Sequence, residues 1–150
     1  MASTSGVPVK FDKIAKSFGV VRVLEELSLD IQPGEFLVLL GASGSGKTTA
    51  LRILAGLETA SSGRITIGGN DVTDVLPKYR DVSMVFQSYA LYPHKTVAEN
   101  IGFPLKVRKV PQAEQDKAIR EAAAQVQIDQ LLDRYPRQLS GGHGQRVALA

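Results

Sequence analysis

The sequence predicts an α/β domain built around a phosphate-binding loop. Three observations support this fold class. Alternating or continuous apolar segments separated by glycine and proline occur in the first half and are typical of short strands. Residues 41–48 match the pattern GxxxxGK[ST] without a gap, between an apolar run and a helical pattern. Beyond Gln87 the apolar periodicity becomes that of helices. A chain of 150 residues is long enough for one ordinary core, so we expect a single domain over residues 1–150.

The first half predicts strands and one helix. Strands are expected at residues 7–11, within 21–31, at 64–67 and at 82–86. The run Phe-Leu-Val-Leu-Leu at residues 36–40 has no polar interruption, which favours a strand buried on both faces. The helix is expected over residues 49–57, where Gly56 lies near its end.

The second half predicts helices. A short helix is expected at residues 96–100, and another at 128–135, closed by Pro136. Residues 112–126 carry apolar side chains at i, i+3, i+4 and i+7, the spacing of one helix face. Residues 139–142 are expected to form a turn, and a further helix to begin at Gln145.

Composition excludes several classes of protein. Hydrophobic residues make up 43% and charged residues 22%, as in soluble globular domains. No apolar run reaches the roughly 20 residues that span a bilayer, and residues 1–8 do not resemble a secretory signal, so we expect a cytoplasmic protein. The absence of cysteine excludes disulfides and thiolate metal sites. The net charge of +3 is scattered, which argues against a nucleic-acid partner.

The loop at residues 41–48 has the chemistry of a triphosphate site. Gly41, Gly44 and Gly46 allow the backbone to curl so that its N–H groups point at phosphate oxygens. The helix that follows adds its positive N-terminal end. Lys47 supplies a mobile charge for the β- and γ-phosphates, and the Thr48 hydroxyl can bind Mg²⁺. The alternative is a flexible Gly/Ser loop, which the flanking strand and helix patterns disfavour.

A second glycine turn, Leu-Ser-Gly-Gly at residues 139–142, precedes the last helix. A serine hydroxyl, a flexible backbone and a helix N-terminus together form an anion site. Taken alone, the turn is better explained by Ser140 acting as a helix N-cap.

These motifs together resemble the nucleotide-binding domain of ABC transporters. Residues 41–48, Gln87, and residues 139–142 followed by Gln-Arg-Val-Ala at 145–148 are similar to the family's Walker A, Q-loop and signature motifs, in the family's order. The likeness covers about residues 9–150. Residues 80–94 and Arg-Tyr-Pro at 134–136 look like ATPase subunits of carbohydrate importers.

The resemblance implies a truncated P-loop NTPase (ABC ATPase) fold, with an antiparallel β subdomain and a helical subdomain. The core and β part would cover about residues 7–87, and the helical part about residues 88–142. The implied ligands are ATP and Mg²⁺. The implied nucleotide-binding residues are Phe18, Gly41, Ser43, Gly44, Ser45, Gly46, Lys47, Thr48, Thr49, Ser140, Gly141, Gly142 and His143.

The resemblance also implies roles for single residues. Lys47 and Gln87 would act in catalysis, and Thr48 and Gln87 would bind Mg²⁺. Phe18 stands where the family has an adenine-stacking aromatic, with a core phenylalanine as the other reading and Phe11 as the alternative candidate. Ser140 and Gly142 would meet the γ-phosphate held by an opposing subunit.

The implied protein is the motor subunit of an importer, in which ATP binding and hydrolysis drive uptake of a sugar. Its implied partners are a second ATP-binding subunit, as in a homodimer-type sandwich, and permease subunits that dock at about residues 87–94, though packing inside the helical subdomain is an alternative role for that segment. It would lie in the cytoplasm, peripheral to the inner face of the cell membrane.

The sequence departs from the family in two places. His143 and Gly144 stand where the signature usually has glutamine and a basic residue, so we expect weaker contact with ATP across the dimer. The Walker B aspartate, the catalytic glutamate and the switch histidine are absent from residues 1–150. We therefore expect a strand without its neighbours and poor solubility of the chain alone.

Two rival functions are left open. A nucleotide-binding interaction module that no longer hydrolyses ATP is favoured by the altered signature and the absent acidic strand. A P-loop kinase or GTPase is disfavoured by the Leu-Ser-Gly-Gly turn and by the absence of base-specificity motifs for guanine.

Overall fold

The structure, a computed structural model, describes residues 6–150 and divides them into two compact units. The first unit extends to Ser83, and the second runs from Met84 to Ala150. The first contains an antiparallel sheet and one helix, and the second contains three helices, so the chain is a mixed α/β protein in the part described.

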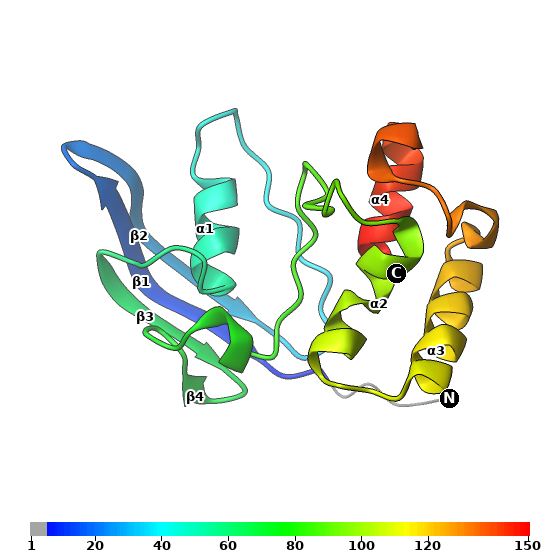
Figure 1. Cartoon of the computed structure of the whole chain (residues 1–150). Helices are drawn as coiled ribbons and strands as arrows, with labels where there is room; N and C mark the ends of the chain where they lie inside the picture. The colour runs from blue at the N-terminus through cyan, green and yellow to red at the C-terminus, as the bar shows by residue number, and fades with distance from the viewer. Residues whose placement is uncertain (1–5) are drawn as a thin grey trace. The chain divides into compact units, whose positions relative to one another are not determined.

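The sheet of the first unit is four-stranded, in the order β2-β1-β3-β4. Its strands are β1 (Val9–Phe18), β2 (Val21–Ile31), β3 (Ser62–Ile67) and β4 (Asn70–Asp71) (Figure 1). Every described pairing is antiparallel, and β1 is central, bonded to both β2 and β3. The expected strands at 7–11, 21–31 and 64–67 are therefore present, the first of them longer than predicted.

An irregularity in β1 decides which side chains face the core. Phe11 and Ile14 are three positions apart, so a regular strand would point them to opposite faces. The register shifts between them, and Lys13 has a positive φ of 50°, which is typical of a β-bulge. Both side chains consequently face the same core, where Phe11 is 3% exposed and Ile14 is fully buried.

Helix α1 (Lys47–Leu54) packs its apolar face on the sheet. Ala50 and Ile53 on this helix are each 2% exposed, and burial of a side chain the size of Ile53 contributes about 1.5–3 kcal/mol. The buried core of the unit consists of Phe11, Ile14, Leu24, Ala50, Ile53, Ile65 and Val72.

Arg80 closes the C-terminal end of α1. Its guanidinium is buried, and it donates to the carbonyl oxygens of Ile53 at 2.7 Å and Leu54 at 3.0 Å. It also donates to the carbonyls of Thr73 at 2.9 Å and Val75 at 2.7 Å, next to the short 3-10 helix η1 (Pro77–Tyr79). At the end of α1 the Ile53 carbonyl also accepts from the Gly56 N–H at 3.1 Å, so Arg80 adds to the bonds that satisfy this helix end. Arg80 therefore ties α1 to the segment that follows β4.

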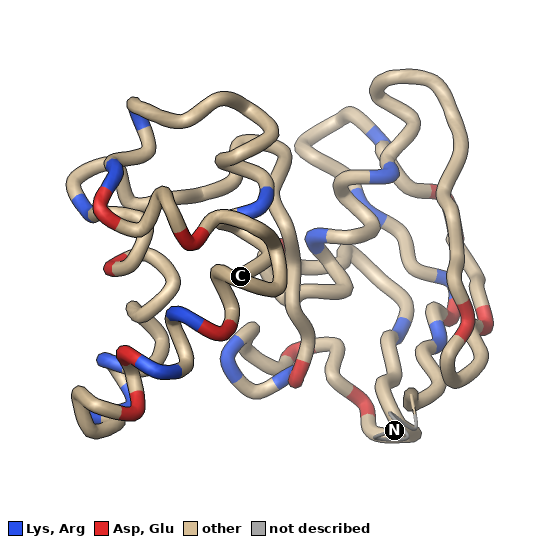
Figure 2. The backbone as a smooth tube through the Cα atoms, turned by 90° about the vertical axis from the view of Figure 1, so that its right-hand side faces the viewer, with Lys and Arg blue, Asp and Glu red and all other residues tan. Residues whose placement is uncertain are grey.

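The second unit is built from α2 (Val97–Val107), α3 (Gln112–Gln125) and α4 (Gly141–Leu149). Its buried core consists of Val97, Ala123, Ile128 and Val147. The helix predicted at residues 112–126 is confirmed, and its predicted apolar face contributes Ala123 to this core. Positively and negatively charged residues are interspersed along the backbone of each unit, as Figure 2 shows.

Local signals fix the start of α2, which is longer than the predicted residues 96–100. Thr96 accepts from the Glu99 N–H at 3.2 Å, and the Glu99 carboxylate accepts from the Thr96 N–H at 2.7 Å. This capping box fixes the start of the helix. Pro104 lies inside it, eight positions on from the N-cap, and α2 continues past it to Val107.

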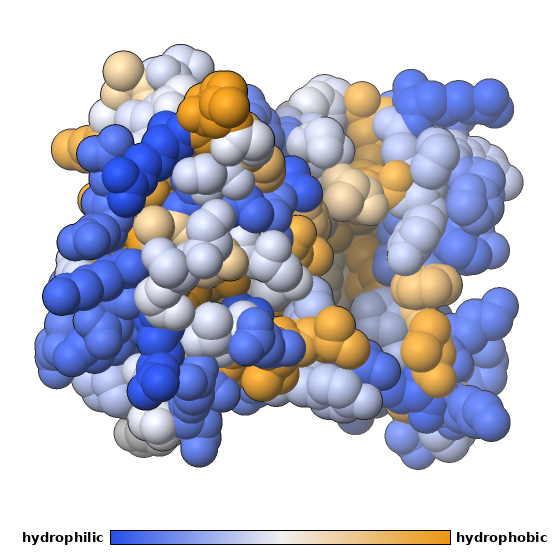
Figure 3. Space-filling view, turned by 90° about the vertical axis from the view of Figure 1, so that its left-hand side faces the viewer, coloured by the Kyte–Doolittle hydropathy of each residue, from blue (hydrophilic) through white to orange (hydrophobic). Residues whose placement is uncertain are grey.

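Two strand predictions are wrong. Residues 36–40 and 82–86 form no strand, and neither is buried. Phe36 is 90% exposed and Leu40 is 89% exposed. A strand buried on both faces needs hydrogen-bonded neighbours, and among the described residues no strand pairs with either segment. Hydrophobic residues therefore reach the surface in several separate patches, some of which are visible in Figure 3.

Three helix predictions need correction. The helix expected at residues 49–57 begins earlier, at Lys47, and ends at Leu54. Residues 128–135 contain only a single 3-10 turn, η2 (Asp129–Leu131), followed by a second one, η3 (Pro136–Gln138). The last helix begins at Gly141 rather than Gln145, because Ser140 provides its N-cap.

Candidate functional site

The predicted phosphate loop lies between residues 36–40 and α1. Gly44 and Gly46 both have positive φ angles, 81° and 87°, and Gly46 is the residue that caps α1. The turn is closed by a hydrogen bond from the Ser45 N–H to the Ala42 carbonyl at 3.2 Å. The loop is largely exposed and ends directly at a helix N-terminus, the arrangement that binds anions.

Neighbouring atoms approach two of the loop glycines closely. A Cβ on Gly46 would lie 2.6 Å from a methyl group of Leu24 and 2.9 Å from the Val23 carbonyl oxygen. A Cβ on Gly41 would lie 2.7 Å from the Ser45 hydroxyl, which can rotate. The loop is thus packed against the backbone of β2 at Gly46, where there is no room for a side chain.

Lys47 holds its ammonium group within the loop. Its Nζ donates to the carbonyl oxygens of Gly41 and Ala42, each at 2.7 Å, and to the Ser45 hydroxyl at 3.1 Å. The first turn of α1 contains no acidic residue, so nothing in that turn opposes the positive end of the helix. A backbone cradle, a lysine within it and an unopposed helix N-terminus fit a phosphate chain.

The other predicted loop residues are placed where a ligand could reach them. Ser43, Ser45 and Thr48 are exposed, and Thr49 is half-buried in α1. Among residues 6–150 no three His, Cys, Asp or Glu side chains gather as a metal site. A Mg²⁺ ion at Thr48 would therefore take most of its other ligands from phosphate oxygens and water, as Mg²⁺ commonly does.

A hollow of about 210 Å³ lies beneath the loop, on the side that faces β2. It is lined by Leu24, Leu27, Leu39, Leu40, Gly41, Ser45, Gly46, Lys47 and Ala50. Its lining is mainly apolar, because four leucines and Ala50 contribute to it.

Phe18 and Phe11 occupy different environments. Phe18 is at the end of β1 and is 47% exposed, whereas Phe11 is 3% exposed in the core. Of these two phenylalanines, therefore, Phe18 is the one whose ring a ligand could stack on. The Lys16 ammonium lies over that ring, 4.8 Å from its centroid.

Gln87 belongs to the second unit, where it starts a turn that continues to Ala90. Gln87 is exposed, and Tyr89 and Ala90 both have positive φ angles, 62° and 51°. His94 is exposed, and its ring is in an edge-to-face arrangement with the Tyr92 ring, with 6.1 Å between the two ring centroids. Gln87 is thus in the second unit, whereas the phosphate loop is in the first.

The second glycine turn forms the start of α4. The Ser140 hydroxyl accepts weakly from the His143 N–H, at 3.4 Å, and is 2.9 Å from the His143 Nδ1. Gly141 and Gly142 are exposed in the first helical turn. Ser140 therefore is an N-cap, and its cap includes the imidazole of His143.

Gly144 is buried by Tyr89, a contact that sequence reasoning missed. A Cβ on Gly144 would lie 3.0 Å from the Tyr89 ring, so the ring packs directly on the helix backbone. A hollow of about 180 Å³ lies beside this contact. It is lined by Ser88, Tyr89, Leu91, Pro136, Leu139, Ser140, Gly141 and Gly144, so residues 88–91 and the glycine turn share one surface.

Lys16 was also missed by sequence reasoning. Its partners, Glu58 and Thr59, are more than 40 positions away in the chain. No local pattern could have found it, although a lysine within a strand that also contains buried residues is a weak signal. The Lys16 ammonium and the adjacent Thr59 N–H hold the pKa of the Glu58 carboxyl below its usual value.

None of the helices in the described part of the chain has the length and apolar character required to cross a membrane.

Comparisons with known proteins agree with this geometry. The profile of the family described as "ABC transporter" matches residues 24–150. The chain is 54% identical over 147 residues to the trehalose/maltose import ATP-binding protein MalK of Thermococcus litoralis. The aligned region covers 94% of this chain and 40% of that protein. It is 51% identical over 142 residues to the sn-glycerol-3-phosphate import ATP-binding protein UgpC of Brucella abortus, with 94% and 40% covered.

A third relative has a different named solute. The chain is 49% identical over 142 residues to the spermidine/putrescine import ATP-binding protein PotA of Aggregatibacter actinomycetemcomitans, covering 95% of this chain and 38% of that protein. The chain therefore spans about two fifths of the length of these curated relatives.

Proposed function

Because the chain belongs to the ABC transporter family, we propose that it is the ATP-binding motor subunit of an importer, which couples ATP binding and hydrolysis to solute uptake. The observation that carries this proposal is the phosphate loop. Lys47 lies within a curled backbone that has no room for a side chain at Gly46, and the loop ends at a helix N-terminus. These are the features that a nucleoside triphosphate requires.

The proposed ligand contacts follow the loop. Lys47 would contact the β- and γ-phosphates, and the backbone N–H groups at residues 43–48 would hold the phosphate oxygens. Thr48 would hold Mg²⁺, and Gln87 would contribute its amide oxygen to the metal or to the attacking water. Bound Mg²⁺ neutralises charge that develops on the phosphates. Phe18 would stack on the adenine.

We propose two kinds of partner. A second ATP-binding subunit would place its Leu-Ser-Gly-Gly turn against the nucleotide held by this chain, and Ser140 and Gly142 would act in the same way on the partner's nucleotide. Permease subunits would dock on residues 87–94, in the cytoplasm at the inner face of the cell membrane. The hollow shared by residues 88–91 and the glycine turn supports a link between these two surfaces.

We favour a sugar as the solute, on the basis of residues 80–94 and the trehalose/maltose relative. However, relatives named for a glycerol phosphate and for polyamines are nearly as similar, at 51% and 49% identity. Because similar ATP-binding chains have names with such different solutes, solute choice is expected to reside in other subunits.

The second candidate function is a nucleotide-binding module that does not hydrolyse ATP. The observation that favours it is the Ser140 hydroxyl, which is engaged by the His143 imidazole at 2.9 Å and so is less available to a phosphate. Replacing His143 with Gln is expected to raise the ATPase rate, and an unchanged rate would contradict weakened contact at this turn. Gly144 is kept in this test, because a side chain there would meet the Tyr89 ring. Single-turnover hydrolysis separates the two functions, because a module would retain ATP without cleaving it.

Calorimetric titration of the purified protein with ATP, with and without Mg²⁺, tests the central proposal. Lys47→Ala is expected to weaken MgATP binding at least about tenfold, since a charged hydrogen bond contributes about 1.5–3 kcal/mol. Lys10→Ala is the matched control, because it removes an exposed lysine of β1. A folded protein that binds ATP with no dependence on Mg²⁺ or on Lys47 would contradict the proposal.

A further inference from the structure

We propose that Lys16 is a positioning residue for adenine recognition, which fixes the Phe18 ring from one face so that the other face can receive the base. This inference rests on the proposed function, in which Phe18 stacks on adenine. Lys16 belongs neither to the phosphate loop nor to the glycine turn at residues 139–142, and the contacts that support its role lie at the end of β1.

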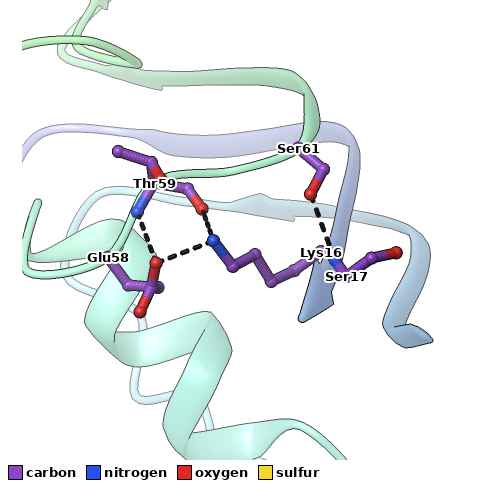
Figure 4. Close-up of polar contacts among 5 residues, drawn as sticks. All are labelled: Lys16, Ser17, Glu58, Thr59 and Ser61. Carbon is purple, nitrogen blue, oxygen red and sulfur yellow. Dashed lines mark hydrogen bonds and ion pairs between the residues drawn. The ribbon is translucent and has the colours of Figure 1, made fainter. Parts of the chain in front are cut away.

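The Lys16 ammonium is held at a defined position beside Phe18. Its Nζ donates to the Glu58 carboxylate at 2.7 Å and to the Thr59 carbonyl oxygen at 2.7 Å (Figure 4). The same Nζ lies 4.8 Å from the centroid of the Phe18 ring, within the range of a cation–π interaction. Two oxygens and one aromatic face thus surround the ammonium group.

Burial makes this arrangement specific. Lys16 is only 8% exposed, whereas Phe18 is 47% exposed. A buried ammonium requires partners for its three N–H groups, and here the ring complements the two oxygens. The cation therefore occupies the inner face of Phe18, and the exposed part of the ring is what remains for a ligand.

The anchor of Lys16 is connected to the phosphate loop through α1. Glu58 and Thr59 lie in the loop that follows α1, and in the same loop the Ser61 hydroxyl accepts from the Ser17 N–H at 3.1 Å. The C-terminal side of α1 is thereby bonded to the end of β1 (Figure 4).

The N-terminal side of α1 is fixed to the neighbouring strand. Gly46 packs against Leu24 of β2, and Leu24 is the register partner of Lys16. Contacts at both ends of α1 therefore set the spacing between the Phe18 ring and the phosphate loop. A nucleotide needs this spacing to be fixed, because its base and its triphosphate are covalently joined.

Fixing the ring before the ligand binds should increase affinity. Ordering one mobile side chain on binding reduces affinity by about two- to tenfold, and a ring already held by Lys16 avoids that loss. The effect should appear for ligands that contain adenine and not for a phosphate chain alone. This difference separates positioning of the ring from a general effect on the phosphate site.

Calorimetric titrations with MgATP and with magnesium tripolyphosphate test the proposal. Lys16→Met keeps the aliphatic length and removes the charge. It is expected to weaken MgATP binding about three- to tenfold and to leave tripolyphosphate binding unchanged. Phe18→Ala should weaken MgATP at least about fivefold, again without affecting tripolyphosphate. Lys10→Met, an exposed lysine on the same strand, is the matched control and should change neither.

The outcomes distinguish this inference from the proposed function. If the unaltered protein binds neither ligand, the proposed function fails. If Phe18→Ala changes neither affinity, base stacking on Phe18 fails, and the role of Lys16 fails with it. If Phe18→Ala weakens MgATP but Lys16→Met does not, or if Lys16→Met weakens both ligands equally, the positioning role alone is refuted.

A second variant decides the question if Lys16→Met does not fold. The chain contains no tryptophan, so Phe18→Trp introduces a single fluorescent reporter at the proposed base site. In that background, Glu58→Gln loosens the anchor of Lys16 and is expected to lower the anisotropy of the indole and to weaken MgATP about two- to threefold. Unchanged anisotropy together with unchanged MgATP affinity would overturn the inference.

Discussion

Replacement of Arg80 by methionine should destabilise the first unit far more than replacement of any exposed arginine there. Arg80 is 4% exposed, and its guanidinium donates to four carbonyl oxygens. Methionine fills part of the volume but donates no hydrogen bond. The variant therefore removes the Arg80 bonds to the Ile53, Leu54, Thr73 and Val75 carbonyls, of which Ile53 keeps its bond from the Gly56 N–H.

The magnitude follows from the burial of each bond. The bond to the Ile53 carbonyl is buried and comes from a charged donor, so its loss costs about 1.5–3 kcal/mol, although the same oxygen keeps its bond from the Gly56 N–H at 3.1 Å. The other three bonds are partly buried, so water can replace them in part, at about 0.5–1 kcal/mol each. Burial lowers the pKa of Arg80, because desolvation disfavours the charged form. Methionine carries no charge, so the variant avoids this desolvation cost, which offsets part of the free energy lost with the four hydrogen bonds. A net loss of about 3 kcal/mol is expected.

Urea denaturation, followed by circular dichroism of the sheet, measures this loss. With a slope of about 1–2 kcal/mol per molar urea, Arg80→Met should lower the midpoint by about 1.5–3 M. Arg64→Met is the matched control: Arg64 is exposed and forms only a surface ion pair with Asp71 at 3.0 Å, which contributes about 0–1 kcal/mol. Equal midpoints for the two variants would refute the argument from buried carbonyls.

Three further predictions concern other contacts. Lys16 is the chief cause that lowers the pKa of Glu58 below its ordinary value of 4.5. The stabilisation that the ionised Glu58 provides is therefore present above pH 4.5 and is lost as the pH falls below it. Glu58→Gln should make the free energy of unfolding depend less on pH in that acid range. Gly144→Ala should destabilise the protein while Tyr89 is present but stabilise it by up to about 1 kcal/mol in a Tyr89→Ser background, measured by thermal melts. Thr96→Ala should lower the free energy of unfolding by about 1 kcal/mol in urea titrations.

Features that depend on neighbours in sequence were predictable. The phosphate loop could be found because the residues at 41–48 and their flanking patterns lie together in the chain. The helix at 112–125 followed from its apolar spacing. The capping box at Thr96 could also have been found, since threonine is followed three positions later by glutamate.

Features that depend on distant partners were not predictable. Residues 36–40 have the composition of a buried strand, but a strand forms only where another strand pairs with it, and composition does not report that. Arg80 reaches Ile53, 27 positions away, and Lys16 reaches Glu58, 42 positions away. Charge patterns alone would have placed both on the surface, as most arginines and lysines are.

Within residues 6–150, no strand pairs with the backbone of residues 36–40, and this has a consequence for labelling with deuterium. Amide hydrogens that lack a partner and face water exchange rapidly, whereas those bonded within β1 and β2 are protected until the unit opens. This segment should therefore be among the first to gain mass in heavy water. Any strand, subunit or small molecule that later binds to this segment would slow its deuterium uptake. The rate of uptake at residues 36–40 therefore measures whether the segment is covered, without an introduced probe.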